Sequence, residues 1–328
     1  MTSFSGPLFV VGSPRSGTKL LRELLNRNPH INLCDPESHF IPHLFDKFGG
    51  DPDHFDVDLD AFFAEFERMP FQVFARDMGK PVMQRADFDQ LKSVHNWQDA
   101  WEIILRHYGE PDKAATAIWG DKTPSYVRDM PLLKRICPNA RFVHIIRDPR
   151  DVALSVHAAW KHDMLRSATK WSRNVAQGRK DGAALGSDYY EIYYEDMLRD
   201  TATTLGGVCD FLGVPYDDAM TTLARPSENI GSAAGKTFID NSNLGKFRGK
   251  IPEKTQKRME EIIYSEAQNT PYEIDFATTA RPLPKWHYGL VTLGDGARSF
   301  LRYIRTKGLV DGIRVNIGNR LQKRRGAP

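Results

Sequence analysis

Short apolar runs alternate along the chain with segments in which apolar residues recur at helical spacing. Four runs predict strands: Leu8–Val11, Ile31–Leu33, Arg141–Ile146 and Asp188–Tyr194. Helical spacing predicts helices at residues 20–25, 152–159, Met197–Leu212 and Glu253–Glu266. Because strands alternate with helices, we predict an α/β fold with a doubly wound, mainly parallel sheet flanked by helices.

Three segments interrupt this alternation. Residues 44–115, rich in Phe, Asp and Trp, show helical periodicity near Asp99–His107 and predict a helical insertion. Gly120–Pro124 predicts a turn or a helix start, and Ser232–Lys250 predicts a loop rich in glycine, lysine and serine. Loops within the insertion and within residues 156–190 are expected to shape a substrate pocket.

The charge of the chain is unevenly distributed. Its 328 residues hold 45 Lys and Arg against 42 Asp and Glu, a net charge of +3 that argues against a dedicated nucleic-acid binder. Residues 281–328 hold 11 basic and 2 acidic residues, which is +9, whereas residues 1–280 hold 34 and 40, which is −6. We therefore expect an α/β domain over residues 1–280 and a basic C-terminal extension over residues 281–328.

The basic extension has the pattern of an amphipathic helix. Ala297, Phe300, Leu301 and Ile304 follow helical spacing, and arginines lie elsewhere around the helix. Such a helix is typical of peripheral contact with an anionic membrane surface, here the inner one. The alternative is a helix docked on the body of the protein or on another subunit of a homo-oligomer.

Other features of the composition predict a cytoplasmic protein. No run of 18 apolar residues exists that could span a membrane, and no leader is evident before the first apolar run. The three cysteines, Cys34, Cys137 and Cys209, are far apart and argue against a disulfide framework or a zinc site.

A glycine-containing loop, Gly12–Lys19, lies between the first predicted strand and the first predicted helix. Such a loop presents backbone N–H groups and the positive end of a helix dipole to an anion, and Arg15, Ser16 and Thr18 add donors. The order Thr18-Lys19 differs from the Lys-Ser/Thr of a Walker loop, and no Mg²⁺ aspartate is evident. We predict a P-loop-like cradle, without a metal, for a nucleotide that lacks a γ-phosphate. The alternatives are a turn without a ligand and a P-loop kinase.

A second candidate phosphate site consists of Arg147 and Ser155. Arg147 follows a predicted buried strand, at the edge where open α/β sheets bind ligands, and Ser155 lies on the next helix. The guanidinium group of an arginine matches the geometry of phosphate oxygens. A salt bridge from Arg147 to Asp148 or Asp151 is the structural alternative.

These two segments together resemble the nucleotide-binding elements of sulfotransferases that use 3′-phosphoadenosine 5′-phosphosulfate (PAPS). Pro14–Thr18 is similar to the 5′-phosphosulfate loop of that family, and Arg147 with Ser155 is similar to its 3′-phosphate pair. Further similar segments follow in the family's order: Pro36–Phe40, Gly120–Pro124, Glu191–Leu198, Phe211–Gly213 and Leu244–Arg248. The resemblance spans about residues 8–255 and is greatest to bacterial enzymes and to the tyrosylprotein and heparan types.

The resemblance implies a general base at Glu37. A carboxylate after a strand end, beside the phosphate loop, is also well positioned to accept a proton, although it could instead cap the next helix. His39 would orient Glu37 or the acceptor. By analogy with the cytosolic branch of the family, the rival bases are His144, His157 and His162.

The resemblance also implies roles for cationic residues. Arg15 would contact the 5′-phosphate and stabilise the bridging oxygen, with Lys19 as a second candidate, and Lys122 would neutralise the sulfuryl or leaving group. Lys246 and Arg248 would cover the 3′-phosphate. The full set implied to bind the donor is Arg15, Ser16, Gly17, Thr18, Lys19, Arg147, Ser155, Lys246, Phe247 and Arg248.

The function implied is transfer of a sulfuryl group from PAPS to an acceptor hydroxyl by in-line displacement, with no metal and no nucleic acid. A carbohydrate, a glycolipid or another small-molecule alcohol is the favoured acceptor, while a phenol and a peptide tyrosine stay open. A non-catalytic protein that binds PAPS or another nucleotide is the remaining alternative to the kinase.

Overall fold

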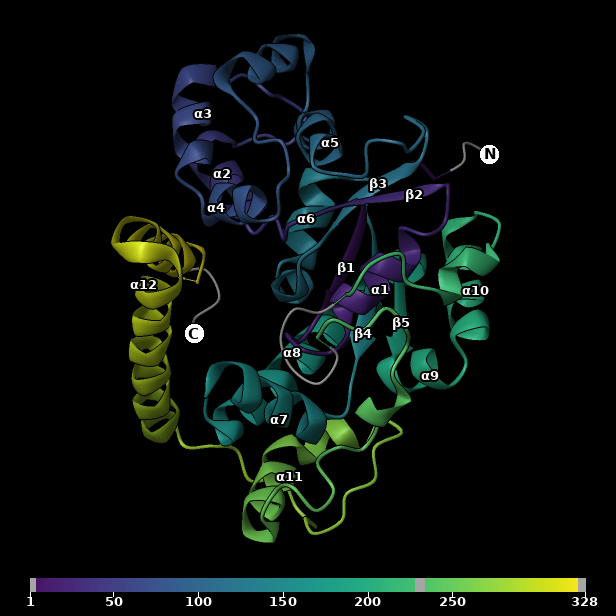
Figure 1. Cartoon of the computed structure of the whole chain (residues 1–328), viewed down its shortest axis with the longest axis vertical. Coiled ribbons are helices and arrows are strands. Elements are labelled where there is room, and N and C mark those ends of the chain that lie inside the picture. Colours follow the sequence, from purple (N-terminus) through teal and green to yellow (C-terminus); the bar gives the residue numbers. More distant parts are fainter. Residues whose placement is uncertain (1–3, 228–233, 324–328) are drawn as a thin grey trace.

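Five parallel strands form the centre of the fold (Figure 1). The computed structural model describes residues 4–227 and 234–323. The strands are β1 (Leu8–Gly12), β2 (Ile31–Cys34), β3 (Ile118–Lys122), β4 (Arg141–Ile146) and β5 (Tyr189–Tyr193). Their spatial order is β2-β3-β1-β4-β5, and every neighbouring pair is parallel. The predicted α/β fold and its four predicted strands are confirmed.

Strand β3 corrects the prediction of a turn or a helix start at Gly120–Pro124. Every residue of β3 is buried although Asp121 and Lys122 are polar, so the strand lacks the apolar pattern that reveals the others. Gly120 is required by the sheet, because a Cβ there would lie 1.9 Å from the carbonyl oxygen of Leu8. The 3₁₀ helix η2 (Pro124–Arg128) begins only after the strand has ended.

Alternate residues of β1 face opposite layers of the fold. Leu8 and Val10 share a core with α1 (Thr18–Leu25), α9 (Tyr194–Arg199) and α10 (Thr201–Leu212). Phe9 and Val11 share a core with α6 (Met130–Ile136) and with the helices of the insertion. Since both faces are covered, β1 reads as a continuous apolar run rather than as an alternating pattern.

A third core lies beyond the carboxyl end of β4. It is formed by α7 (Pro149–Trp160), α8 (Met164–Leu185) and α11 (Glu253–Ala267), and α7 and α11 match predicted helices. Helix α8 occupies most of residues 156–190, one of the two segments in which loops were expected to shape a substrate pocket. The helix predicted over Met197–Leu212 is divided at Asp200, whose side chain accepts a hydrogen bond from the Thr203 N–H and caps α10.

Helices fill the predicted insertion. They are α2 (Ile41–Phe48), α3 (Leu59–Glu67), α4 (Pro70–Asp77) and α5 (Trp97–His107), with the 3₁₀ helix η1 (Arg85–Ser93). Buried aromatic side chains hold them together, among them Phe40, Phe62, Phe66, Trp97 and Trp101. Aromatic pairs of this kind add to the stability that burial alone provides.

The described chain ends in a long helix, α12 (Lys285–Lys323), which is interrupted at Gly308 (φ 77°, ψ 175°). Helix α12 lies at the outer edge of the molecule, where it contacts α8 and the insertion helices α2 and α4 (Figure 1). Residues 232–233 of the predicted loop and 324–328 of the predicted extension lie outside the described residues. None of the described helices combines the length and apolarity needed to cross a bilayer. The domain boundary near residue 281 stays a prediction.

Candidate active site

The candidate site residues lie along the carboxyl edge of the sheet in the order of the strands. Glu37 follows β2, Lys122 ends β3, the loop Gly12–Lys19 joins β1 to α1, Arg147 follows β4 and Tyr194 follows β5. Ligands bind at this edge in open α/β sheets. Because β3 lies between β2 and β1, Lys122 stands between Glu37 and the phosphate loop.

The phosphate loop approaches Tyr194 so closely that only glycine fits at its end. Gly17 has φ 91° and precedes α1, and a Cβ on it would lie 2.2 Å from Cδ2 of Tyr194. Arg15 also has a positive φ, of 72°. Positive φ costs a glycine little but strains other residues. The first N–H groups of α1 have no partner within the helix and suit an anion.

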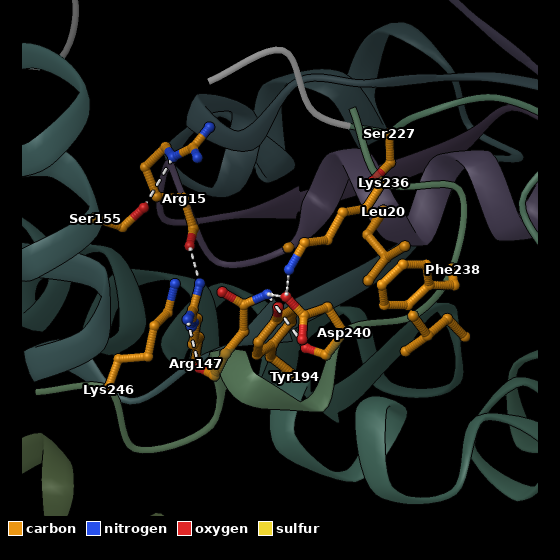
Figure 2. Close-up of a pocket in the computed structure, with 13 residues that line it drawn as sticks. Arg15, Leu20, Arg147, Ser155, Tyr194, Ser227, Lys236, Phe238, Asp240 and Lys246 are labelled. Carbon is orange, nitrogen blue, oxygen red and sulfur yellow. Dashed lines mark hydrogen bonds and ion pairs between the residues drawn. The ribbon is translucent and has the colours of Figure 1, made fainter. Parts of the chain in front are cut away.

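Arg15, Arg147 and Ser155 line one pocket (Figure 2). The Arg15 Nε donates to Ser155 Oγ at 3.1 Å, and Arg147 Nη1 donates to the carbonyl oxygen of Arg15 at 3.2 Å. Lys246 points into the same pocket. Two segments identified from separate motifs therefore lie together. Arg147 Nη2 also lies 3.8 Å from Asp151 Oδ2, so the salt bridge to Asp151 that was the structural alternative is present as well.

Other residues that line this pocket were given no role from the sequence, among them Tyr194, Lys236 and Asp240. The guanidinium of Arg147 lies 4.3 Å from the ring centroid of Tyr194, a cation–π arrangement. Lys236 Nζ lies 2.5 Å from Asp240 Oδ2. Tyr194 follows a strand directly, so its position after a strand end was a usable signal. Lys236 and Asp240 lie in a loop whose sequence carries no such signal.

The polar groups of the pocket and of the adjoining phosphate loop fit an anionic ligand. Ser16 Oγ and Arg147 Nε are buried and have no hydrogen-bond partner in the described part of the chain. Burial, together with the charge of Arg147, lowers the pKa of Lys246 to about 8. A bound anion would supply the missing partners and favour the charged lysine. The residues present therefore suit a ligand that carries several phosphate oxygens.

The other predicted donor-binding residues are not among those that line the pocket: Ser16, Thr18, Lys19, Phe247 and Arg248. Ser16 and Thr18 are buried within the loop. Phe247 is buried in the third core, with the guanidinium of Arg150 at 4.0 Å from its ring centroid. The Arg248 side chain is 61% exposed and lies 3.9 Å from Asp275.

A second cluster joins the ends of β2 and β3. Lys122 Nζ donates to Glu37 Oε1 at 2.5 Å, and His39 Nε2 is hydrogen-bonded to Glu37 Oε2 at 2.9 Å. Ser125 Oγ lies 3.2 Å from His39 Nδ1. Burial alone would raise the pKa of Glu37, but Lys122 and His39 hold it well below its ordinary value. Glu37 is therefore ionised. It does not cap α2, whose first turn receives no side-chain cap.

The loop that carries Glu37 is anchored through Ser38. Ser38 Oγ donates to Asp121 Oδ2 at 2.9 Å and lies 2.8 Å from Tyr126 Oη. Burial raises the pKa of Asp121, although the bonds from its neighbours oppose the shift. Asp121 directly precedes Lys122 in β3. The hydrogen bond from Ser38 to Asp121 therefore holds Glu37 and His39, the neighbours of Ser38, close to Lys122.

The rival histidines lie elsewhere. His144 is fully buried in β4, where Nδ1 lies 2.7 Å from Tyr189 Oη and burial lowers its pKa to about 4. His157 Nδ1 lies 2.9 Å from the carbonyl oxygen of His162, and His162 Nε2 lies 2.9 Å from Ser299 Oγ of α12. These bonds place His157 and His162 at the junction of α7, α8 and α12.

Known proteins share this chain's sequence pattern and its fold. The model of the Sulfotransferase family matches residues 7–218. Protein-tyrosine sulfotransferase 1 of Danio rerio is 23% identical over 275 residues, which cover 77% of this chain and 68% of the relative. Protein-tyrosine sulfotransferase 2 of Gallus gallus is 24% identical over 269 residues, which cover 75% and 64%. The chain thus spans about two thirds of the length of these relatives.

Two solved structures share the fold. The sulfotransferase domain of the Synechococcus PCC 7002 olefin synthase matches with a TM-score of 0.54 and 22% identity, covering 82% of this chain and 98% of that domain. The sulfotransferase domain from the curacin biosynthetic pathway matches with a TM-score of 0.53 and 18% identity, covering 84% and 100%. Fold and site thereby define a P-loop-like α/β protein. The chain belongs to the sulfotransferase family, as its motifs predicted, and is a PAPS-dependent sulfotransferase by class.

Proposed function

We propose that the protein transfers a sulfuryl group from PAPS to the hydroxyl group of a carbohydrate, a glycolipid or another small-molecule alcohol. The observation that carries the proposal is the order of groups along the sheet edge. The base candidate Glu37, the cation Lys122 and the phosphate pocket follow one another on neighbouring strands. A hydroxyl nucleophile, a transferring group and a nucleotide need the same linear order for in-line displacement.

The pocket residues would hold the nucleotide part of the donor. Arg147, Ser155 and Lys246 are proposed to bind the 3′-phosphate, and Arg15 with the loop backbone to bind the 5′-phosphate. PAPS, when bound, supplies the electrophilic sulfuryl group. Arg15 would stabilise the negative charge that develops on the bridging oxygen as the bond between sulfur and that oxygen breaks.

Glu37 is proposed to accept the proton of the acceptor hydroxyl as the new bond between oxygen and sulfur forms. A carboxylate whose pKa is held low by Lys122 is a weak base. We therefore propose that Lys122 turns from Glu37 toward the anionic group being transferred, which raises the basicity of Glu37 when a donor is present. His39 would keep Glu37 oriented through its bond to the second carboxylate oxygen.

The acceptor class rests on the resemblance rather than on a shaped pocket. The relatives named protein-tyrosine sulfotransferases support a tyrosine phenol as the second candidate acceptor. Membership of the family leaves the kinase alternative without support. The cytoplasmic location, the peripheral membrane contact and a homo-oligomer stay predictions.

The test combines turnover and binding. Glu37→Gln should lower sulfuryl transfer from labelled PAPS by about 10²- to 10⁴-fold, the usual effect of a general base, and should leave binding of adenosine 3′,5′-bisphosphate intact in calorimetry. Glu67→Gln is the matched control, because Glu67 is exposed at the end of α3. Undiminished sulfuryl transfer in Glu37→Gln would refute the role of Glu37 as the general base. Donor binding without transfer to any alcohol, sugar or tyrosine acceptor would favour the non-catalytic alternative.

A further inference from the structure

Helix α12 turns a polar face toward the body of the protein. Asp295 is buried there, with Oδ2 2.9 Å from Arg166 Nη1. Arg166 Nε donates to Thr292 Oγ1 at 2.9 Å, and His162 Nε2 lies 2.9 Å from Ser299 Oγ. These contacts attach the first half of α12 to the start of α8 through ion pairs and hydrogen bonds.

Four large apolar residues of the same half of α12 face solvent. Trp286, Leu290, Leu293 and Leu301 are 69%, 61%, 74% and 60% exposed. With the exposed Ala297 they recur at intervals of three and four residues, so they form one stripe along the helix. A surface helix of a globular protein normally buries its apolar stripe and exposes its polar face. On α12 these four side chains are instead exposed in the described part of the chain, and they form an apolar patch on the surface.

Positive charge borders the stripe. Lys285, Arg298 and Arg305 are exposed on α12, and residues 281–328 carry 11 basic residues against two acidic ones. One of those two, Asp295, is turned inward and paired with Arg166 and with the half-exposed Arg298. The outer surface of α12 therefore combines large apolar side chains with cations, the composition that binds anionic lipid.

We propose that the outer face of α12 docks on an anionic membrane surface, with the leucine stripe in the interfacial layer and the arginines at the headgroups. Helix α12 lies at the outer edge of the molecule, so its stripe can reach a flat surface (Figure 1). A second copy of the chain is disfavoured as the occupant, because pairing two stripes would bring two sets of cations together. The proposal uses no step of the transfer reaction.

The experiment is vesicle flotation with the full chain. The wild-type protein should float with phosphatidylglycerol vesicles at low salt, and should float little with phosphatidylcholine vesicles or at high salt. Leu290→Glu with Leu293→Glu should weaken binding to phosphatidylglycerol by roughly tenfold or more, since charge enters the interfacial layer. The control is Gln90→Glu with Ala202→Glu, which makes the same charge change at exposed positions on η1 and α10.

Calorimetric binding of adenosine 3′,5′-bisphosphate confirms that each variant is folded. Equal flotation of the wild type and the stripe variant would overturn the proposal, as would equal binding to both lipids. A concentration-dependent dimer that the stripe variant dissociates, in a protein that does not float, would assign the face to a second copy instead. Light scattering after size-exclusion chromatography measures that outcome.

Discussion

Lys122 Nζ lies 2.5 Å from Glu37 Oε1, and the two residues come from the ends of neighbouring strands. The Lys122 side chain is 3% exposed and the Glu37 side chain is 37% exposed, so the pair has one buried and one accessible partner. The accessible carboxylate can meet an acceptor, whereas the ammonium group is buried. This geometry ties the ionisation of the proposed base to the position of one lysine.

The first prediction follows from that coupling. Lys122→Met should raise the pKa of Glu37 toward its ordinary value, because the positive charge that lowers it is removed. If Glu37 must be ionised, the acid limb of kcat/KM should move to higher pH in the variant. Turnover should also fall by about 10²- to 10³-fold, since a cation at the transferring group is lost.

The measurement is a pH–rate profile of both proteins with labelled PAPS. Lys254→Met, an exposed lysine on α11, is the control for loss of a charge. An acid limb at the same pH in wild type and Lys122→Met would show that Lys122 does not set the ionisation of the group that limits transfer.

The second prediction concerns the phosphate pocket. Arg147→Ala and Lys246→Ala should each weaken binding of adenosine 3′,5′-bisphosphate by about 10- to 100-fold, the worth of one charge-assisted hydrogen bond. Arg147→Lys should restore only part of the loss, because an ammonium cannot make two parallel bonds. Calorimetry measures the affinities, with Arg199→Ala as the control, since Arg199 is exposed on α9. Unchanged affinity in both alanine variants would remove these residues from the donor site.

Much of this site was predictable because its motifs follow apolar strands. The apolar run Arg141–Ile146 predicts β4, and Arg147 directly follows this strand. Strand β3 was missed because two of its five residues, Asp121 and Lys122, serve the site and replace apolar ones. The spatial order of the strands depends on long-range packing that local patterns do not encode. For that reason the position of Lys122 between Glu37 and the phosphate loop emerged only from the fold.

Residues outside strand ends were harder to predict. Phe247 resembles a nucleotide-covering aromatic residue in its motif, yet it packs against Arg150 in the core. Lys236 and Asp240 reach the pocket from a loop in which no spacing marks them. Side chains on such loops are positioned by tertiary contacts, which leave no periodic signal in the sequence.

The third prediction tests the contact between the phosphate loop and Tyr194, the first residue of α9. Gly17→Ala should lower the free energy of unfolding by about 1–3 kcal/mol, because a residue with a Cβ is strained at φ 91° and would collide with Tyr194. Adding Tyr194→Ala removes the collision but not the strain, so the double variant should lose less stability than the two single changes added together. Urea unfolding measures the cycle. Strictly additive losses of stability in the two single variants would show that the phosphate loop and the Tyr194 ring are not in close contact.

The last prediction concerns His144, the buried histidine that competes with Glu37 as a base. Burial lowers its pKa from 6.5 to about 4, so between these values the unfolded chain binds a proton that the folded chain does not. Stability therefore falls as the pH drops from 7 to 5, and His144 should account for about 2 kcal/mol of that loss. In His144→Gln this part of the pH dependence should vanish, although the loss of the bond to Tyr189 lowers stability at pH 7. Urea unfolding at the two pH values measures the difference. Because His144 lies in the core, the folded variant should keep the wild-type pH profile of sulfuryl transfer. A variant that stays folded at pH 7 but has lost its transfer activity would instead make His144 part of the reaction.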